Sequence, residues 1–136
     1  MWIRAKFYQL GIWTSPSSAA LYFRGIAQDD LIMVIVVGLD SAREIVDFLS
    51  RISHDESAIR YVKDMVLAVQ EAKGLSLSGI YIDRKNMRYS AALRFGIEDE
   101  NVEIQCSLAC ALSVAIACSV DVYGPAEEFT AHPDAP

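Results

Sequence analysis

The segment 101–129 constrains the fold most strongly, because it places a continuous apolar run between two strand-like pieces. The run from Leu108 to Val120 falls short of the roughly 18 to 20 residues that a membrane-spanning helix requires. Its periodicity does not separate helix from strand, but its length and its Ala and Leu content favour a helix. We therefore expect a buried helix over 107–119, followed by a strand over 120–123.

The N-terminal part of the chain carries strand patterns. Apolar residues alternate with polar ones from Trp2 to Leu10, and a Ser-Pro-Ser-Ser turn at 15–18 precedes a second strand over 20–23. These segments predict a hairpin. The β-branched run Leu31–Val37 lacks alternation, which is typical of a strand buried on both faces. The sequence therefore predicts a central position for this strand.

Two helices are expected in the middle of the chain. Ser41 followed by Glu44 fits a capping box, which predicts a short helix beginning there. After a polar connection over 53–57, apolar residues recur at helical spacing and Gly74 provides a stop. The apolar stripe of that second helix consists of Ile59, Val62, Val66 and Val69.

Strand patterns return after the second helix. Segments 77–83, 89–95 and 102–106 have the composition of strands, with turns at 84–86 and 98–101. This irregular mixture predicts an α+β fold with a mixed or antiparallel sheet of about six to seven strands. About three helices accompany the sheet in this prediction.

Length and composition bound the domain organisation. With 136 residues, 53% of them apolar, the chain can fill one core. We expect a single domain over 1–129 and a flexible tail over 130–136, where too little apolar surface is available to offset the ordering entropy. The first residues alternate like a strand and do not have the pattern of a signal peptide, which predicts a cytoplasmic location without membrane association.

Charge and cysteine content narrow the function. A net charge of −6 and a pI of about 4.8 oppose nonspecific binding to phosphate backbones, so any nucleic-acid contact must be local. Three cysteines, Cys106, Cys110 and Cys118, lie in one apolar segment and are expected to pack as small hydrophobic side chains. They form no Cys-x-x-Cys knuckle, and His54 and His132 lie in polar segments, which disfavours a zinc site.

Several separated blocks resemble one known family. Residues 34–42 read V-I-V-V-G-L-D-S-A, residues 63–65 read K-D-M, and residues 82–91 read I-D-R-K-N-M-R-Y-S-A. Residues 105–128 contain Q-C-S-L-A-C-A-L, then V-Y and E-E. In this order they are similar to the I-W-I-G-x-x-E-A, H-D-L, I-T-D-L-R-D-G-T-F-Y-A and R-P-S-D-A blocks of the bifunctional nuclease (BFN) domain family. The resemblance covers residues 2–129.

The resemblance implies an α+β nuclease that acts on RNA and DNA and tends to self-associate. The matched acidic positions, Asp64 and Asp83, would be its catalytic residues, with Mg²⁺ or Mn²⁺ as the cofactor. Lys63 and the basic turn would contact the substrate backbone, with Tyr89 beside that turn able to stack a base. The residues of the turn are Arg84, Lys85 and Arg88.

Four positions of the family motifs hold different residues in this chain. Ser41 stands where the family usually has Glu, and Gln105 where it tends to have Asp. Ser107 replaces the motif Arg, which would clamp a phosphate. Cys110 replaces a motif Asp. Ser41, Gln105 and Cys110 bind Mg²⁺ poorly or not at all.

Two functional hypotheses follow. The first is a divergent nuclease that cleaves DNA or RNA with a divalent ion, if Asp64 and Asp83 converge on it. The second is a catalytically silent, homo-oligomeric binding or regulatory module without a cofactor, acting through protein partners. The sequence leaves structural roles open as well: Asp64 as an exposed helix residue, Asp83 as a turn-forming carboxylate, and the basic turn as a solvated hairpin tip.

Overall fold

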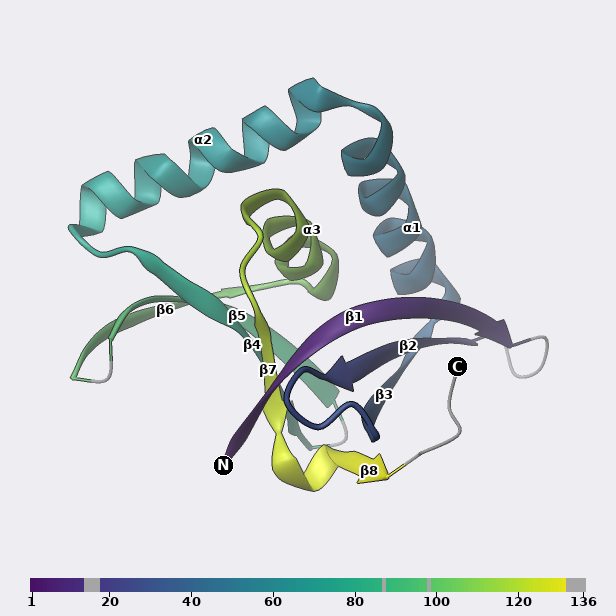
Figure 1. Cartoon of the computed structure of the whole chain (residues 1–136). Coiled ribbons are helices and arrows are strands. Elements are labelled where there is room, and N and C mark those ends of the chain that lie inside the picture. Colours follow the sequence, from purple (N-terminus) through teal and green to yellow (C-terminus); the bar gives the residue numbers. More distant parts are fainter. Residues whose placement is uncertain (14–17, 87, 98, 132–136) are drawn as a thin grey trace.

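A computed structural model describes residues 1–13, 18–86, 88–97 and 99–131, and within them the chain forms one eight-stranded mixed sheet and three α-helices (Figure 1). The predicted α+β class is confirmed. The elements are β1 (Trp2–Trp13), β2 (Ser18–Gly25), β3 (Leu31–Gly38), α1 (Leu39–His54), α2 (Glu56–Lys73), β4 (Leu77–Lys85), β5 (Arg88–Ile97), β6 (Glu100–Cys106), α3 (Leu108–Cys118), β7 (Val122–Pro125), the 3-10 helix η1 (Ala126–Glu128) and β8 (Phe129–Ala131).

The sheet joins two antiparallel parts through one parallel pair. The strand order is β6-β5-β4-β7-β1-β2-β3-β8, and β4 with β7 is the parallel pair. Figure 1 shows the three α-helices on the same side of the sheet, with α3 between the sheet and α2. The molecule therefore has three layers where α2 lies over α3. We call the opposite face of the sheet the far face.

Helix α3 is the centre of the core, as the sequence predicts. Seven of its residues are buried, and the cluster around it contains Phe23 and Phe95 among the largest fully buried side chains. Ser107 caps the helix by accepting a hydrogen bond from the Cys110 N–H at 3.1 Å, and Ser119 ends it in the left-handed conformation at φ 53°. The small side chains of α3 let the sheet and the other helices approach it closely.

The predicted central position of β3 is wrong. Its neighbour on the outer side is β8, which pairs only with the first residues of β3 and forms the edge of the sheet. Val36 is 45% exposed, while Met33 and Ile35 on the helix side are fully buried. A continuous apolar run fits a strand whose two faces are unequally covered, and strand order depends on pairing with distant segments.

Helix α1 begins earlier and is longer than predicted. Gly38 is its N-cap residue and makes no side-chain cap, so Ser41 lies inside the first turn and forms no capping box. The helix has 16 residues and is not short. The prediction of a polar connection over 53–57 is also wrong, because only Asp55 separates α1 from α2. Its carboxylate accepts a hydrogen bond from the Ser57 N–H at 2.9 Å and caps α2.

The C-terminal segment is more ordered than predicted. The last strands are β7, which begins at Val122, and β8, whose Ala131 pairs with Leu31. The first two residues of the predicted flexible tail, Thr130 and Ala131, therefore belong to the sheet, held by the buried Phe129 that precedes them. Residues 132–136 and most of the predicted turn at 15–18 lie outside the described residues.

Other predicted boundaries are confirmed. Gly74 ends α2 in the left-handed conformation at φ 68°, which a glycine adopts without steric cost. The hairpins β1–β2, β4–β5 and β5–β6 pair in antiparallel register. Across the described residues, none of the helices has the length and apolarity needed to cross a membrane.

Candidate functional site

The structure does not bring the two predicted catalytic aspartates together. Asp64 is exposed on α2, in the outermost layer. Ile80 and Ile82 of β4 point to the helices. Because successive residues of a strand face opposite sides of the sheet, Asp83 points to the far face, where it lines a small hollow with Tyr81. The sheet and α3 therefore stand between the two carboxylates. Asp83 lies within β4, opposite Ser90, and also accepts a hydrogen bond from the Arg84 N–H at 2.8 Å.

This arrangement does not fit Mg²⁺ or Mn²⁺. A hard divalent cation needs several oxygen ligands converging at about 2.1 Å. Within the described parts of the chain, no group of three His, Cys, Asp or Glu side chains lies close enough to hold a metal ion.

The predicted substrate-binding cations are only partly together. Arg84, Lys85 and Arg88 share the tip of the β4–β5 hairpin, where Lys85 and Arg88 are paired in register. Arg84 forms an ion pair with Glu128 at 3.7 Å, so part of its charge is already balanced. Lys63 lies on α2, where its charge acts on Cys118 at the end of α3. A single strip of cations for a nucleic-acid backbone is not formed.

Tyr89 is not placed to stack a base beside the basic turn. Its hydroxyl donates a hydrogen bond to the Val34 carbonyl oxygen at 3.4 Å, and its ring packs against the core. Burial, followed by the charge of Glu128, raises the pKa of Tyr89, while Arg84 opposes the shift. The sequence showed Tyr89 next to the turn but did not show that it faces inward.

Two of the four substituted family positions do meet. Ser41 from the first turn of α1 and Ser107 from the N-cap of α3 line one hollow of about 170 Å³, together with Glu44 and Tyr89. Gln105 instead lies on the far face, in a hollow of about 80 Å³ that it shares with Asp83. The fourth position, Cys110, lies in the first turn of α3. Among the residues lining the Ser41 hollow, Glu44 is the one carboxylate, and none is a cation.

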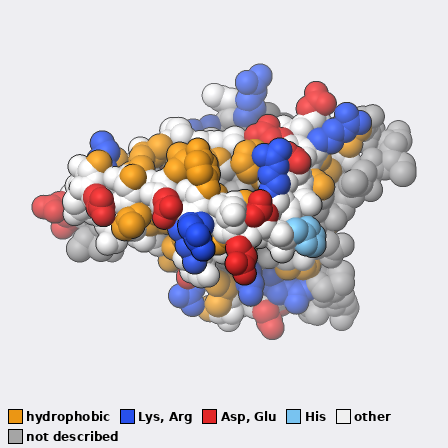
Figure 2. All heavy atoms as spheres, turned by 90° about the horizontal axis from the view of Figure 1, so that it is seen from above, with side chains coloured by type: hydrophobic (Ala, Val, Ile, Leu, Met, Phe, Trp, Pro, Cys, Tyr) orange, Lys and Arg blue, Asp and Glu red, His pale blue; other side chains and the backbone are white. Residues whose placement is uncertain are grey.

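An apolar groove of about 320 Å³ separates α2 from β5, β6 and α3. Tyr61, Met65 and Val69 of α2 form one wall, and Phe95 with Ile104 of the sheet forms the other. Figure 2 shows hydrophobic side chains gathered on the face seen from above, interspersed with charged ones. Tyr61 is 67% exposed and Met65 54% exposed. The predicted apolar stripe of α2 packs against the core through Val62, Val66 and Val69, but the sequence did not show that Tyr61 and Met65 beside it would stay exposed.

The cause of this exposure is the position of α2 in the outer layer. Of its 18 residues, Val66 is the one that is buried. The helix packs on α3 and α1, and the small side chains of α3 cover little of it. An amphipathic helix normally buries such a stripe against a core. Here much of the stripe lines an open groove.

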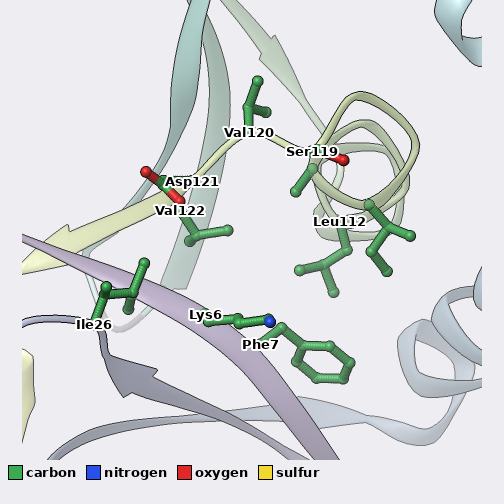
Figure 3. A pocket seen from close by; sticks show the side chains of 11 residues that line it. Lys6, Phe7, Ile26, Leu112, Ser119, Val120, Asp121 and Val122 are labelled. Atoms are coloured by element: carbon green, nitrogen blue, oxygen red, sulfur yellow. The ribbon is translucent and has the colours of Figure 1, made fainter. Parts of the chain in front are cut away.

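A larger hollow, of about 540 Å³, lies between β1, the end of α3 and the start of β7 (Figure 3). Figure 3 shows Phe7 and Leu112 pointing into it, with Lys6 and Asp121 at its margins. Asp121 already forms an ion pair with Arg4 at 3.5 Å. The hollow collects no group of titratable side chains that would define a reaction.

Sequence reasoning also missed an aromatic cluster on the far face. Tyr81 stacks on Tyr123 with ring centroids 4.7 Å apart, and Trp2 meets Tyr81 edge-on at 5.1 Å. Arg94 lies 3.6 Å from the centre of the Tyr81 ring and donates to Glu103 at 2.6 Å. The alternation of side chains in β1, β4 and β5 indicates which residues share a face of the sheet. It does not indicate which strands are neighbours, because strand order depends on pairing between distant segments. Since Glu103 balances the charge of Arg94, the cluster stabilises the sheet and is a poor platform for phosphates.

No protein-family model matches this sequence, and no curated protein matches it either. Membership of the BFN family therefore stays a prediction.

Proposed function

We propose that this protein is a catalytically silent relative of the BFN family that acts as a binding module, and that it self-associates through the groove beside α2. The observation that carries the proposal is the uncovered apolar face of α2. Met65 and Tyr61 are more than half exposed beside an almost wholly apolar groove. Contiguous exposed apolar surface of this kind marks an interaction site in soluble proteins.

A second copy of this chain is the partner that the surface fits best. A two-fold interface requires one patch that is complementary to itself. This patch has both parts, because Tyr61 and Met65 project at the rim of the groove that can receive them. If α2 pairs antiparallel with its symmetry mate about Met65, Tyr61 of one copy lies near Val69 of the other. Each groove then receives apolar side chains from the opposite helix.

The charges of α2 favour the same arrangement. The helix carries three acidic residues against three basic ones, so its own net charge is 0 while the chain carries −6. The acidic residues are Glu56, Asp64 and Glu71, and the basic ones are Arg60, Lys63 and Lys73. Antiparallel pairing puts Glu56 at the start of one helix near Lys73 at the end of the other. It also aligns the helix dipoles favourably. The patch thus avoids the repulsion that two acidic chains would otherwise feel.

The position of the substituted motif residues supports both the resemblance and the loss of catalysis. Ser41 and Ser107 share one hollow, as two positions of one family site would. The family has Glu and Arg there, and this chain has two hydroxyls. All three cysteines are free, which supports the proposal of a reducing, cytoplasmic location.

The test is the oligomeric state of the purified chain as a function of concentration, measured by sedimentation equilibrium at physiological salt. We expect a reversible monomer–dimer equilibrium. A monomer at every concentration up to the millimolar range would overturn self-association. A dimer that persists after the α2 groove has been disrupted would assign the interface to another surface.

A further inference from the structure

The floor of the α2 groove contains a pair of cysteines. Cys106 is the last residue of β6, and Cys110 lies in the first turn of α3, four residues later. Their side chains are hydrogen-bonded to each other, both are half-buried, and both line the groove. The strand-to-helix turn at Ser107 creates this contact. Its hydroxyl accepts from the Cys110 N–H and so fixes the first turn of α3.

We infer that Cys106 and Cys110 form a thiol–disulfide exchange site that reacts with small-molecule disulfides of the glutathione class. Cys110 is the attacking thiol and Cys106 is the resolving thiol. The hydrogen bond places the two thiols next to each other at the junction of β6 and α3, where a disulfide between them would form. Their opening is the groove itself, whose volume of about 320 Å³ admits part of a tripeptide disulfide.

The environment distinguishes the roles of the two thiols. The Cys106 thiol donates its hydrogen to the Cys110 sulfur, which lowers the pKa of Cys110 to about 7, although burial opposes this shift. The same hydrogen bond, and then burial, raise the pKa of Cys106. The N-terminal end of α3 also favours a thiolate at Cys110. Cys110 therefore carries the negative charge in the reduced pair.

The reaction balances as two exchanges. The Cys110 thiolate attacks one sulfur of glutathione disulfide, forms a mixed disulfide and releases one glutathione thiolate, which takes up a proton. The Cys106 thiol then loses its proton to water, attacks the Cys110 sulfur and releases the second glutathione. The pair loses two electrons and two protons, and one glutathione disulfide becomes two glutathione thiols. A single copy of the chain contains both thiols, and because the proposed dimer would fill the groove that leads to them, the exchange is a reaction of the monomer.

The rate advantage at neutral pH is modest but measurable. At pH 7 a thiol with a pKa of about 7 is about half ionised, against roughly 3% for an ordinary cysteine. Its lower basicity reduces the intrinsic nucleophilicity by about fivefold. The net gain is on the order of threefold over an exposed ordinary cysteine. Cys118 is an internal reference, because burial raises its pKa and it lies outside the groove lining.

The experiment is a time course of the native full chain with glutathione disulfide, at a protein concentration at which sedimentation shows a monomer, followed by alkylation, intact mass and peptide mapping. We expect wild type to lose two thiols without retaining glutathione, with the disulfide mapped to Cys106 and Cys110. Cys106→Ser should stop at one glutathione on Cys110. Cys110→Ser should form no internal disulfide and react at least threefold more slowly. Cys118→Ser should behave as wild type, and circular dichroism checks that each variant folds.

Three results would overturn the inference: glutathione on Cys118 as fast as on the pair, a wild-type adduct that never resolves, or no reaction. The pH dependence of the rate of the first exchange step distinguishes attack by a Cys110 thiol of lowered pKa from attack by an ordinary thiol. The rate in wild type and in Cys106→Ser should be compared between pH 6 and 9. In wild type it should level off above pH 7, whereas an unperturbed thiol keeps gaining up to about pH 9.

Discussion

Replacing Met65 with aspartate should weaken self-association strongly, because Met65 lies on the proposed two-fold axis and meets its own copy there. Its side chain is 54% exposed in the single chain. Complete burial of a methionine side chain stabilises by about 1.5–3 kcal/mol. Roughly half of this, about 0.8–1.6 kcal/mol per copy, is gained only on association. Two copies lose about 1.6–3.2 kcal/mol, which weakens the dimer by about 15- to 200-fold. Two aspartates facing each other add repulsion beyond that figure.

The assay compares sedimentation equilibrium of wild type and Met65→Asp over the same concentration range. Ile26→Asp is the matched control, because Ile26 is 41% exposed and lines the hollow near β1 instead of the groove. We expect the control to dimerise like wild type. Aspartate in an exposed helix interior costs only about 0.7 kcal/mol of stability, so the variant should fold. Equal dissociation constants for wild type and Met65→Asp would refute the assignment of the interface to α2.

Three further predictions concern catalysis and stability. Wild type and the Asp64→Asn, Asp83→Asn double variant should both leave labelled DNA and RNA uncleaved with Mg²⁺ or Mn²⁺, and wild-type cleavage lost in the variant would show a working site. Gly124→Ala should destabilise by about 1–3 kcal/mol in urea unfolding, because its Cβ would lie 2.7 Å from a methionine sulfur of β3. Gly38→Ala, which has open space, is its control, and an equal loss in both would contradict the reasoning. Ser107→Ala should cost about 1 kcal/mol through the lost helix cap, and an unchanged midpoint would exclude that role.

Local sequence determined much of the fold. Length and composition identified α3 as a buried helix, and Gly74 ends α2 in the left-handed conformation. The predictions that failed depend on contacts between segments that are distant in the sequence. The neighbours of β3 depend on Phe129 carrying β8 back to it, across almost the whole length of the chain. The capping box at Ser41 failed because β3 runs directly into α1 with Gly38 as the cap.

The candidate site was less predictable, because side-chain direction depends on the order of strands. Asp83 could be placed at a strand end, but not on the far face, until the helices were known to cover the other one. The cysteines show the same limit. Spacing favoured small hydrophobic packing for Cys106 and Cys110, and both are indeed half-buried. The contact between them arises from the turn at Ser107, which no periodicity encodes.

The groove and its thiol pair have a common structural origin in the small residues of α3. Because that helix is built mainly of Ala, Ser and Cys with few large side chains, most of it can be buried, but it fills little space between the sheet and α2. Helix α2 packs on it at one edge, and Ser113 and Cys110 leave the space beside them open. Larger residues there would close the groove within one chain and shield the thiols together. An open groove costs the single chain apolar burial, and a second copy of α2 recovers that burial when it associates.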